Sequence, residues 1–220
     1  GWHAPVLFPV VGRCLNDQIN IEAQVFKMEK HGFARKSEFK LLQQHPNELT
    51  FLLESNETTL AQYPFHFSFS ITYRLVENEL KTIYEVKNKS SERMYFSLGG
   101  HPAFKVPFFD GEQYEDYSIS FKNDVDLDRH WINEDGFFNG IKTPVLNHSH
   151  LLPLQCDLFK DDALIFKNLQ SRSVTLQSNK NSKQLHFSFP DFNYLGLWAK
   201  VNAPYVCIEP WLGCADTVAE

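Results

Sequence analysis

The sequence is poor in the features that mark several large classes of protein. Cysteine is scarce: the chain has Cys14, Cys156, Cys207 and Cys214, and none of them are in CxxC spacing. We therefore expect reduced thiols rather than a disulfide framework or a zinc site. No apolar run approaches the roughly 20 residues that a membrane-spanning helix needs, and the first residues lack a charged segment followed by an apolar one. These absences predict a cytoplasmic protein that does not associate with a membrane.

Positive charge is also in short supply. The 220 residues carry 21 basic and 27 acidic side chains, for a net charge of −6, and no basic stripe is interleaved with aromatic residues. Nucleic acid is therefore not an expected partner. The chain shows no internal repeat, low-complexity tract or break in composition, so we expect a single domain over residues 1–220.

Alternation of apolar and polar residues is the dominant pattern. Apolar side chains occupy every second position of residues 65–75, and a polar turn at 77–79 leads to a second alternating run at 80–87. This pattern predicts a β-hairpin. Further runs of strand length follow at residues 49–53, 117–121, 163–166, 173–177, 184–189, 195–200 and 205–209.

Helical periodicity is nearly absent. Residues 36–44 are expected to form at most a brief helical turn, and residues 108–113 and 133–150 are expected to be long connections at the rim. The 20 Phe, 8 Tyr and 4 Trp residues would fill the space between two sheets. We therefore predict an all-β protein built as a large antiparallel β-sandwich.

Two stretches place an ionisable side chain at the end of a strand-like run. Residues 97–104 read SLGGHPAF and contain His101, and residues 205–211 read YVCIEPW and contain Glu209. In each stretch the apolar residues face the core, which leaves small groups beside the imidazole and aromatic rings beside the carboxylate. An imidazole and a carboxylate in one cleft can move protons in opposite directions on one substrate.

These stretches and three others resemble the aldose 1-epimerase (galactose mutarotase) family, most closely its shorter LacX-like branch. The matching blocks run in family order along nearly the whole chain: residues 5–13, 31–35, 99–104, 162–166 and 207–211. The resemblance implies the galactose mutarotase-like supersandwich fold. Because the chain opens inside the family's pattern, we expect the strands that usually come before this point to be missing from it.

The resemblance also implies an activity and the residues that perform it. The reaction would interconvert the α and β anomers of a hexose by ring opening and reclosure, with His101 as the general acid and Glu209 as the general base. Neither a cofactor nor a metal is demanded. Arg13, His31 and Asp162 match family positions that hold sugar hydroxyls or the ring oxygen, although the adjacent Asp161 competes for the last of these positions.

Other residues extend the expected site. Arg35 is either a ligand or part of a solvated basic patch, and Trp198 or Trp211 would stack on the apolar face of the pyranose. Burial opposes the charges on both members of an acid–base pair. We therefore expect Arg13 or another donor to offset the desolvation of Glu209.

Three alternatives remain beside this interpretation. The substrate would be a hexose 6-phosphate if Arg13, Arg35 and Lys36 converge on its dianion. A sandwich that binds carbohydrate without turning it over is a second possibility. A glycoside hydrolase is disfavoured, because that chemistry needs two carboxylates and the marked pair is an imidazole and a carboxylate. The particular sugar and the oligomeric state are not readable from the sequence.

Overall fold

A computed structural model describes residues 5–218. Strands dominate this part of the chain, and helix is limited to α1 (Glu57–Leu60) and three short 3₁₀ turns. The strands are β1 (Val6–Leu7), β2 (Gln18–Ile21), β3 (Gln24–Lys27), β4 (Lys40–His45), β5 (Glu48–Glu54), β6 (Phe67–Val76), β7 (Glu79–Asn88), β8 (Leu98–Gly100), β9 (Ala103–Lys105), β10 (Tyr117–Phe121), β11 (Leu127–Ile132), β12 (Phe138–Leu146), β13 (Leu151–Pro153), β14 (Leu164–Phe166), β15 (Ser173–Ser178), β16 (Gln184–Ser188), β17 (Tyr194–Trp198) and β18 (Tyr205–Leu212).

Two sheets form the sandwich that the alternation predicts. The central six-stranded sheet has the order β1-β8-β18-β17-β14, with β9 also paired to β18, and a four-stranded sheet has the order β13-β10-β15-β16. Their facing side chains form one continuous buried cluster, to which β18 contributes Val206 and Ile208 and β10 contributes Ile119. Both sheets are antiparallel, so the all-β sandwich is confirmed.

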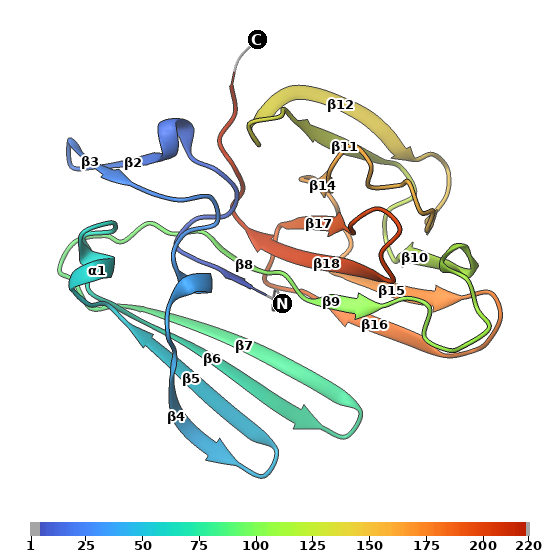
Figure 1. Ribbon diagram of the computed structural model, residues 1–220, viewed down its shortest axis with the longest axis horizontal. Coiled ribbons are helices and arrows are strands. Elements are labelled where there is room, and N and C mark those ends of the chain that lie inside the picture. The colour runs from blue at the N-terminus through green and yellow to red at the C-terminus, as the bar shows by residue number, and fades with distance from the viewer. Residues whose placement is uncertain (1–4, 219–220) are drawn as a thin grey trace.

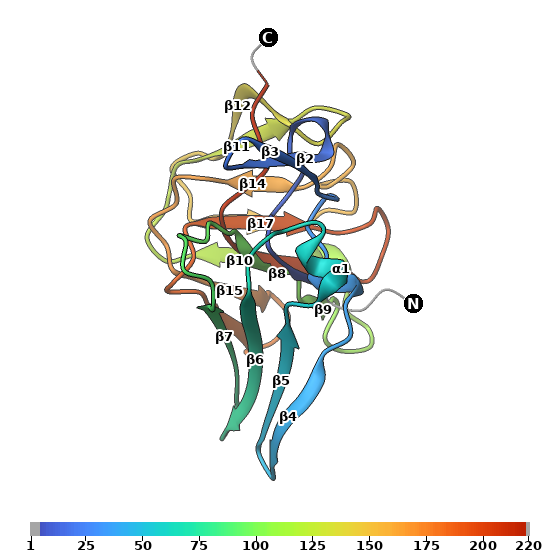
Figure 2. The ribbon, with the colours of Figure 1, turned by 90° about the vertical axis from the view of Figure 1, so that its left-hand side faces the viewer.

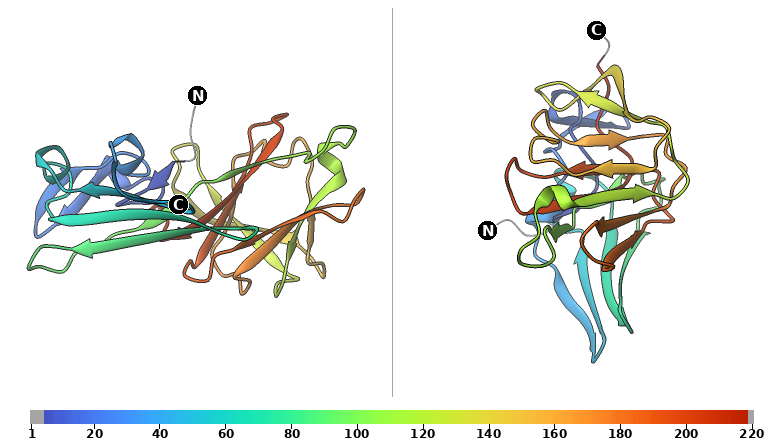
Figure 3. Two further views of the ribbon diagram at one scale, coloured as in Figure 1. Left: turned by 90° about the horizontal axis from the view of Figure 1, so that it is seen from below. Right: turned by 90° about the vertical axis from the view of Figure 1, so that its right-hand side faces the viewer.

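A third sheet, β4-β5-β6-β7, extends away from the rest of the molecule (Figures 1 and 2). Phe67, Phe69 and Ile71 of β6 point into a second core, where they pack with Phe8 and Phe33. The β6–β7 hairpin confirms the hairpin predicted from residues 65–87. Seen from below, this sheet occupies one end of the molecule and the sandwich the other (Figure 3).

The outer face of the central sheet is only partly covered. Leu7, Val11, Ile165 and Trp211 form a small buried cluster there with Phe138 of β12. The β11–β12 hairpin therefore reaches over the face of the sheet that is turned away from the sandwich core, at the top of the view in Figure 1. A hollow bounded on one side by this hairpin contains the residues of interest.

The predictions for two segments are wrong. Residues 36–44 do not turn into a helix; a 3₁₀ turn at Ala34–Lys36 is followed by β4, whose backbone pairs with β5. Residues 133–150 are not simply a connection, because they contain β12. In both pairings the register shifts, at Leu41 to Gln43 and twice within β11–β12, and such shifts interrupt the alternation by which strands are recognised.

Within residues 5–218, no helix has the length and apolar character needed to cross a membrane.

All four cysteines are free thiols, with Cys207 buried and Cys156 exposed.

Candidate active site

The register of two strands sets His101 opposite Glu209. Gly99 pairs with Trp211 on one side and Ala103 pairs with Cys207 on the other. His101 lies midway between its two paired neighbours and Glu209 lies midway between theirs. The His101 Nε2 and Glu209 Oε1 atoms are 3.2 Å apart. The two side chains are therefore cross-strand neighbours at the short break between β8 and β9, which lie beside β18 in Figure 1.

The environment of the pair opposes charge on both members. Glu209 is 3% exposed, and burial raises its pKa from 4.5 to about 8, an effect increased by the nearby Asp162. Burial also lowers the pKa of His101 below 6.5, and the charge of Arg35 adds to this decrease, against a backbone hydrogen bond that raises it. In the free protein near neutral pH, the pair therefore holds one proton as a carboxylic acid beside a neutral imidazole.

Trp211 lies under the site because glycines make room for its ring. A Cβ atom on Gly99 would lie 2.8 Å from Cδ1 of Trp211, and one on Gly196 would lie 2.7 Å from its Cζ2. The indole N–H lowers the pKa of Glu209, although it does not reach the geometry of a hydrogen bond and is buried without an acceptor. Lys30 lowers the pKa of Glu209 as well. The cations and donors that favour an ionised Glu209 are thus Lys30 and Trp211.

His31 is held in one tautomer by the backbone of Gly12. The backbone N–H of Gly12 donates to His31 Nδ1 at 3.1 Å, and the backbone N–H of His31 donates to the Gly12 carbonyl at 2.8 Å. Burial lowers the pKa of His31 to about 3, so the ring is neutral at physiological pH. Because Nδ1 accepts a hydrogen bond, the proton is on Nε2, which can donate to an oxygen of a ligand.

The turn that carries His31 depends on the next residue. Gly32 has φ of +70°, and a Cβ atom there would lie 2.2 Å from the carbonyl oxygen of Phe8. Only glycine permits this approach.

Asp162 lies in a loop held by Arg129. Arg129, on β11, is buried, stacks on the Trp131 ring at 3.6 Å and donates to the backbone carbonyls of Asp161 and Asp162. Asp162 has a positive φ of 77°. Residues other than glycine keep such a backbone conformation when the surrounding structure holds them in it. One carboxylate oxygen of Asp162 accepts the Ala163 N–H at 2.7 Å, and the other oxygen can accept from a ligand. Of the two neighbouring aspartates, Asp162 lines the cavity.

These side chains surround a cavity of about 330 Å³. This volume is typical of small-molecule sites. Trp198 lies edge-on to the His101 ring, with centroids 6.3 Å apart. The lining residues are Gly12, Lys30, His31, His101, Ile132, Gly136, Phe138, Asp162, Ala163, Ile165, Trp198, Glu209, Trp211 and Ala215.

The sequence did not mark Lys30 or the hairpin residues Ile132, Gly136 and Phe138 as part of this site. The neighbouring His31 was the available signal for Lys30. The hairpin gave no signal, because its contact with the cavity arises from the tertiary packing of β12 on the central sheet.

The expected arginine ligands are not among the residues that line the cavity. Arg13 instead donates to both carboxylate oxygens of Asp17, at 2.6 and 2.8 Å, and to the carbonyl of Asp135. It therefore does not supply the charge that was expected beside Glu209, whose ion-pair contact is His101. Arg35 is half-buried with its Nε atom unpaired, and its charge lowers the pKa of both His31 and His101.

One set of side chains at the site has donor atoms suited to a metal ion. The donor atoms of His101, Cys207 and Glu209 all lie within 4.8 Å of one another. Cys207 faces the same side of β18 as Glu209, and burial raises the pKa of its thiol to about 12.

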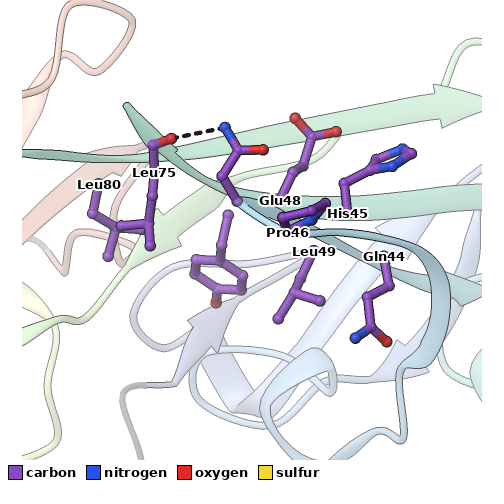
Figure 4. Close-up of a pocket in the computed structure, with 9 residues that line it drawn as sticks. Gln44, His45, Pro46, Glu48, Leu49, Leu75 and Leu80 are labelled. Atoms are coloured by element: carbon purple, nitrogen blue, oxygen red, sulfur yellow. Dashed lines mark hydrogen bonds between the residues drawn. The ribbon is translucent and has the colours of Figure 1, made fainter. Parts of the chain in front are cut away.

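A larger hollow, of about 760 Å³, lies at the end of the β4–β7 sheet and is mainly apolar (Figure 4). Leu49, Tyr73, Leu75 and Leu80 line much of it. Its carboxylate, Glu48, is paired with Arg74. With its carboxylate already neutralised by an arginine, this hollow lacks an acid–base pair, and the smaller cavity at His101 and Glu209 is the candidate active site.

Comparison with known proteins agrees with this fold. The family model for aldose 1-epimerase matches residues 1–219, and the chain belongs to this family. The plasmid and chromosomal forms of protein LacX from Lactococcus lactis subsp. lactis are each 35% identical to it, over 99% of this chain and 76% of theirs.

Two solved structures are similar over nearly the whole chain. A galactose mutarotase related enzyme from Lactobacillus acidophilus is 36% identical, with a TM-score of 0.88 over 98% of this chain and 72% of that one. A galactose mutarotase-like protein from Lactobacillus casei is 32% identical, with a TM-score of 0.88 over 99% of this chain and 76% of that one. Membership in a family of sugar epimerases and the mutarotase-like sandwich predicted from the sequence are therefore both confirmed.

Proposed function

We propose that this protein is an aldose 1-epimerase that interconverts the α and β anomers of a neutral hexose, with His101 and Glu209 as its acid–base pair. The observation that carries the proposal is the direct contact of these two side chains, 3.2 Å apart, at the wall of a sugar-sized cavity. The family supports a sugar substrate, and the cavity that both side chains line supports the assignment of the site.

The close spacing of the pair suits the reaction. Ring opening takes a proton from the anomeric hydroxyl O1 and delivers one to the ring oxygen O5. Both oxygens are bonded to the same carbon, C1, so the acid and base must lie close together rather than at opposite ends of the pyranose. Glu209 accepts the proton from O1, His101 donates to O5, and the roles reverse after the aldehyde has rotated about the C1–C2 bond.

The charge state of the pair also fits. The pair must hold one proton in total, and the environment of the free protein favours that state near neutral pH. The proton is shared between carboxylate and imidazole, so the form with imidazolium and carboxylate has the same total charge as the form with both groups neutral. Placing the sugar oxygens against the pair then moves the proton without changing the charge of the site.

Other residues of the cavity would hold the sugar. The His31 Nε2–H is a donor, the free carboxylate oxygen of Asp162 is an acceptor, and the partly exposed Trp198 ring offers a face for the C–H groups of the pyranose. Arg13 and Arg35 are omitted from this proposal because neither lines the cavity.

The charges around the cavity favour a neutral sugar over a hexose 6-phosphate. Of the cations expected to bind a phosphate, Arg13 is paired with Asp17 and Lys36 is paired with Glu29. The third, Arg35, does not line the cavity. Lys30 lines the cavity, but so does the carboxylate of Asp162. A phosphate dianion would gain little where a lysine is offset by an aspartate.

The test is the rate of anomer exchange on freshly dissolved glucose and galactose, followed by polarimetry. Glu209→Gln and His101→Asn should each lower kcat about 100- to 10,000-fold, which is the usual contribution of a positioned acid or base. Glu48→Gln and His45→Asn are matched controls, because both residues line the separate hollow of Figure 4, and these variants should retain the wild-type rate.

Three results would contradict the proposal: no acceleration by the wild-type protein, a sugar bound without turnover, or full activity in both site variants. Inclusion of glucose 6-phosphate and of inorganic phosphate as a competitor tests the phosphate alternative. Strong competition by phosphate would favour that substrate class.

A further inference from the structure

The acid–base pair has a third close neighbour that the proposed reaction does not use. The Sγ atom of Cys207 and the donor atoms of His101 and Glu209 lie within 4.8 Å of one another, and both Cys207 and Glu209 are buried. All three are held by the same strand pairing: Cys207 and Glu209 share a face of β18, and Cys207 pairs with Ala103, which closely follows His101. The three donor atoms therefore converge from β18 and from the short break between β8 and β9, both of which pair with β18.

Their chemistry and spacing suit a zinc ion. Zn²⁺ takes thiolate, imidazole and carboxylate ligands at about 2.0–2.3 Å, so tetrahedral ligand atoms stand about 3.3–3.8 Å apart. The His101 and Glu209 donor atoms are already 3.2 Å apart, and small side-chain rotations would bring the sulfur to the same range. A thiolate and a carboxylate would also neutralise the divalent ion, which is the condition for placing it in a buried site.

The cavity supplies the remaining coordination position. Zinc sites with three protein ligands keep a fourth position for water or a ligand, and His101 and Glu209 line a cavity of about 330 Å³. An ion at this point would occupy the lone pairs that the proton transfer needs.

We propose that His101, Cys207 and Glu209 form an inhibitory binding site for Zn²⁺ and similar thiophilic divalent cations. The inhibition rests on the proposed epimerase function, whereas the metal binding does not. Zinc ions and sugar compete for the same two side chains.

The binding is tested by titrating the whole protein with Co²⁺ and recording its absorption spectrum, in which thiolate coordination gives a charge-transfer band and tetrahedral geometry gives intense d–d bands. The wild type should bind a single Co²⁺ per chain with both features. Cys207→Ser should lose the charge-transfer band and bind at least about 10-fold more weakly, the range seen when a metal site loses a supporting group. Cys156→Ser is the matched control, because Cys156 is an exposed thiol that donates a hydrogen bond to Glu115. This variant should behave as the wild type.

Circular dichroism confirms that each variant is folded, and Cys207→Ala provides a second removal of the sulfur if Cys207→Ser does not fold. The proposal is overturned if the wild type shows no thiolate band, or if the band is unchanged in the folded Cys207 variant. Inhibition is then measured with Zn²⁺ by polarimetry. Metal binding without any epimerase activity would reject the proposed function alone, and activity that Zn²⁺ leaves untouched would reject the inhibitory site alone.

Discussion

At the scale of single residues, the charge of the His101–Glu209 pair determines when the site can work. Burial displaces the two pKa values in opposite directions, with Glu209 raised to about 8 and His101 lowered below 6.5. Between these limits the pair holds its single proton. Below them both groups are protonated and the base is lost, and above them neither is protonated and the acid is lost.

The pH dependence of kcat/KM should therefore be bell-shaped, with its acid limb below pH 6.5 and its alkaline limb near pH 8. The measurement is polarimetry on glucose from pH 5 to 9, with chelator present so that metal ions do not contribute. A flat profile over this range would remove the acid–base assignment of the pair.

The same burial gives a prediction about stability. Glu209 has a pKa of about 8 in the folded protein and 4.5 as its ordinary value. Its folded-state pKa is raised, so the folded state binds the proton more tightly, and the stability that this provides is lost as pH rises from 4.5 to 8. Each unit of pKa difference corresponds to about 1.4 kcal/mol.

Glu209→Gln has no carboxylate to ionise and should melt at a higher temperature than the wild type at pH 8, with the gap narrowing toward pH 4.5. Each kcal/mol corresponds to about 2–4 °C in a protein of this size. Thermal unfolding followed by circular dichroism across this range checks the sign. A gap that stays constant with pH would show that Glu209 is not the titrating group, and a variant that is both more stable and inactive would show that burial of the carboxylate serves the reaction.

At the scale of elements, the loop before β14 is positioned by a buried arginine on another strand. Arg129 joins β11 to the backbone of Asp161 and Asp162 and stacks on Trp131. The Nη2 atom of Arg129 donates to both carbonyls, and a lysine lacks the planar guanidinium that stacks on Trp131 and holds this nitrogen in place.

Arg129→Lys should therefore loosen the Asp162 loop and raise KM about 10-fold, equivalent to about 1.4 kcal/mol, while kcat changes little because the acid–base pair is untouched. Arg172→Lys is the matched control, since Arg172 also donates to two backbone carbonyls, those of Leu169 and Ser171. Steady-state kinetics separate the two parameters. A fall in kcat with unchanged KM would contradict a positioning role for Arg129.

The elements that carry the acid–base pair were predictable from the sequence, and those that enclose the cavity were not. In the stretches that contain His101 and Glu209, apolar residues alternate with polar or small ones, so their faces can be assigned from the sequence alone, although β18 is buried on both faces. The spacing of the pair was not predicted from the sequence: the strand register brings the two side chains into contact at 3.2 Å. Register between strands that are distant in sequence depends on hydrogen bonds that a single sequence does not reveal.

The role of Arg13 illustrates the same limit. Its position in a matching block predicted a ligand, but the competing partner Asp17 lies four residues further along the chain and accepts from the Nε and Nη2 atoms of the guanidinium. The alternation of apolar and polar residues does not reveal an ion pair between side chains that are close in the sequence. The β11–β12 hairpin was missed because its register shifts disrupt the pattern that marks other strands.

At the scale of the whole molecule, two separate hollows differ in their lining residues. The one at the end of the β4–β7 sheet is larger, and its lining includes the exposed Leu75 and Leu80. The smaller one contains the acid–base pair.

A double substitution, Leu75→Ser with Leu80→Ser, should leave kcat/KM for anomer exchange within about twofold, because exposed substitutions away from a site cost about 0.5 kcal/mol or less. The same variant should reduce the binding of a hydrophobic dye to the protein, since these leucines are 55% and 63% exposed. A loss of turnover in a folded variant would show that the outlying sheet communicates with the cavity.

The placement of the pair opposite each other across β8, β9 and β18 has a consequence for how such a protein can diversify. The proposed acid–base pair is anchored in a backbone ladder, whereas the groups that would recognise the sugar, including His31 and Asp162, come from turns. If the proposed function holds, exchange of those turns would alter which sugar is accepted while the ladder keeps the acid–base pair in place, so one scaffold could serve several substrates.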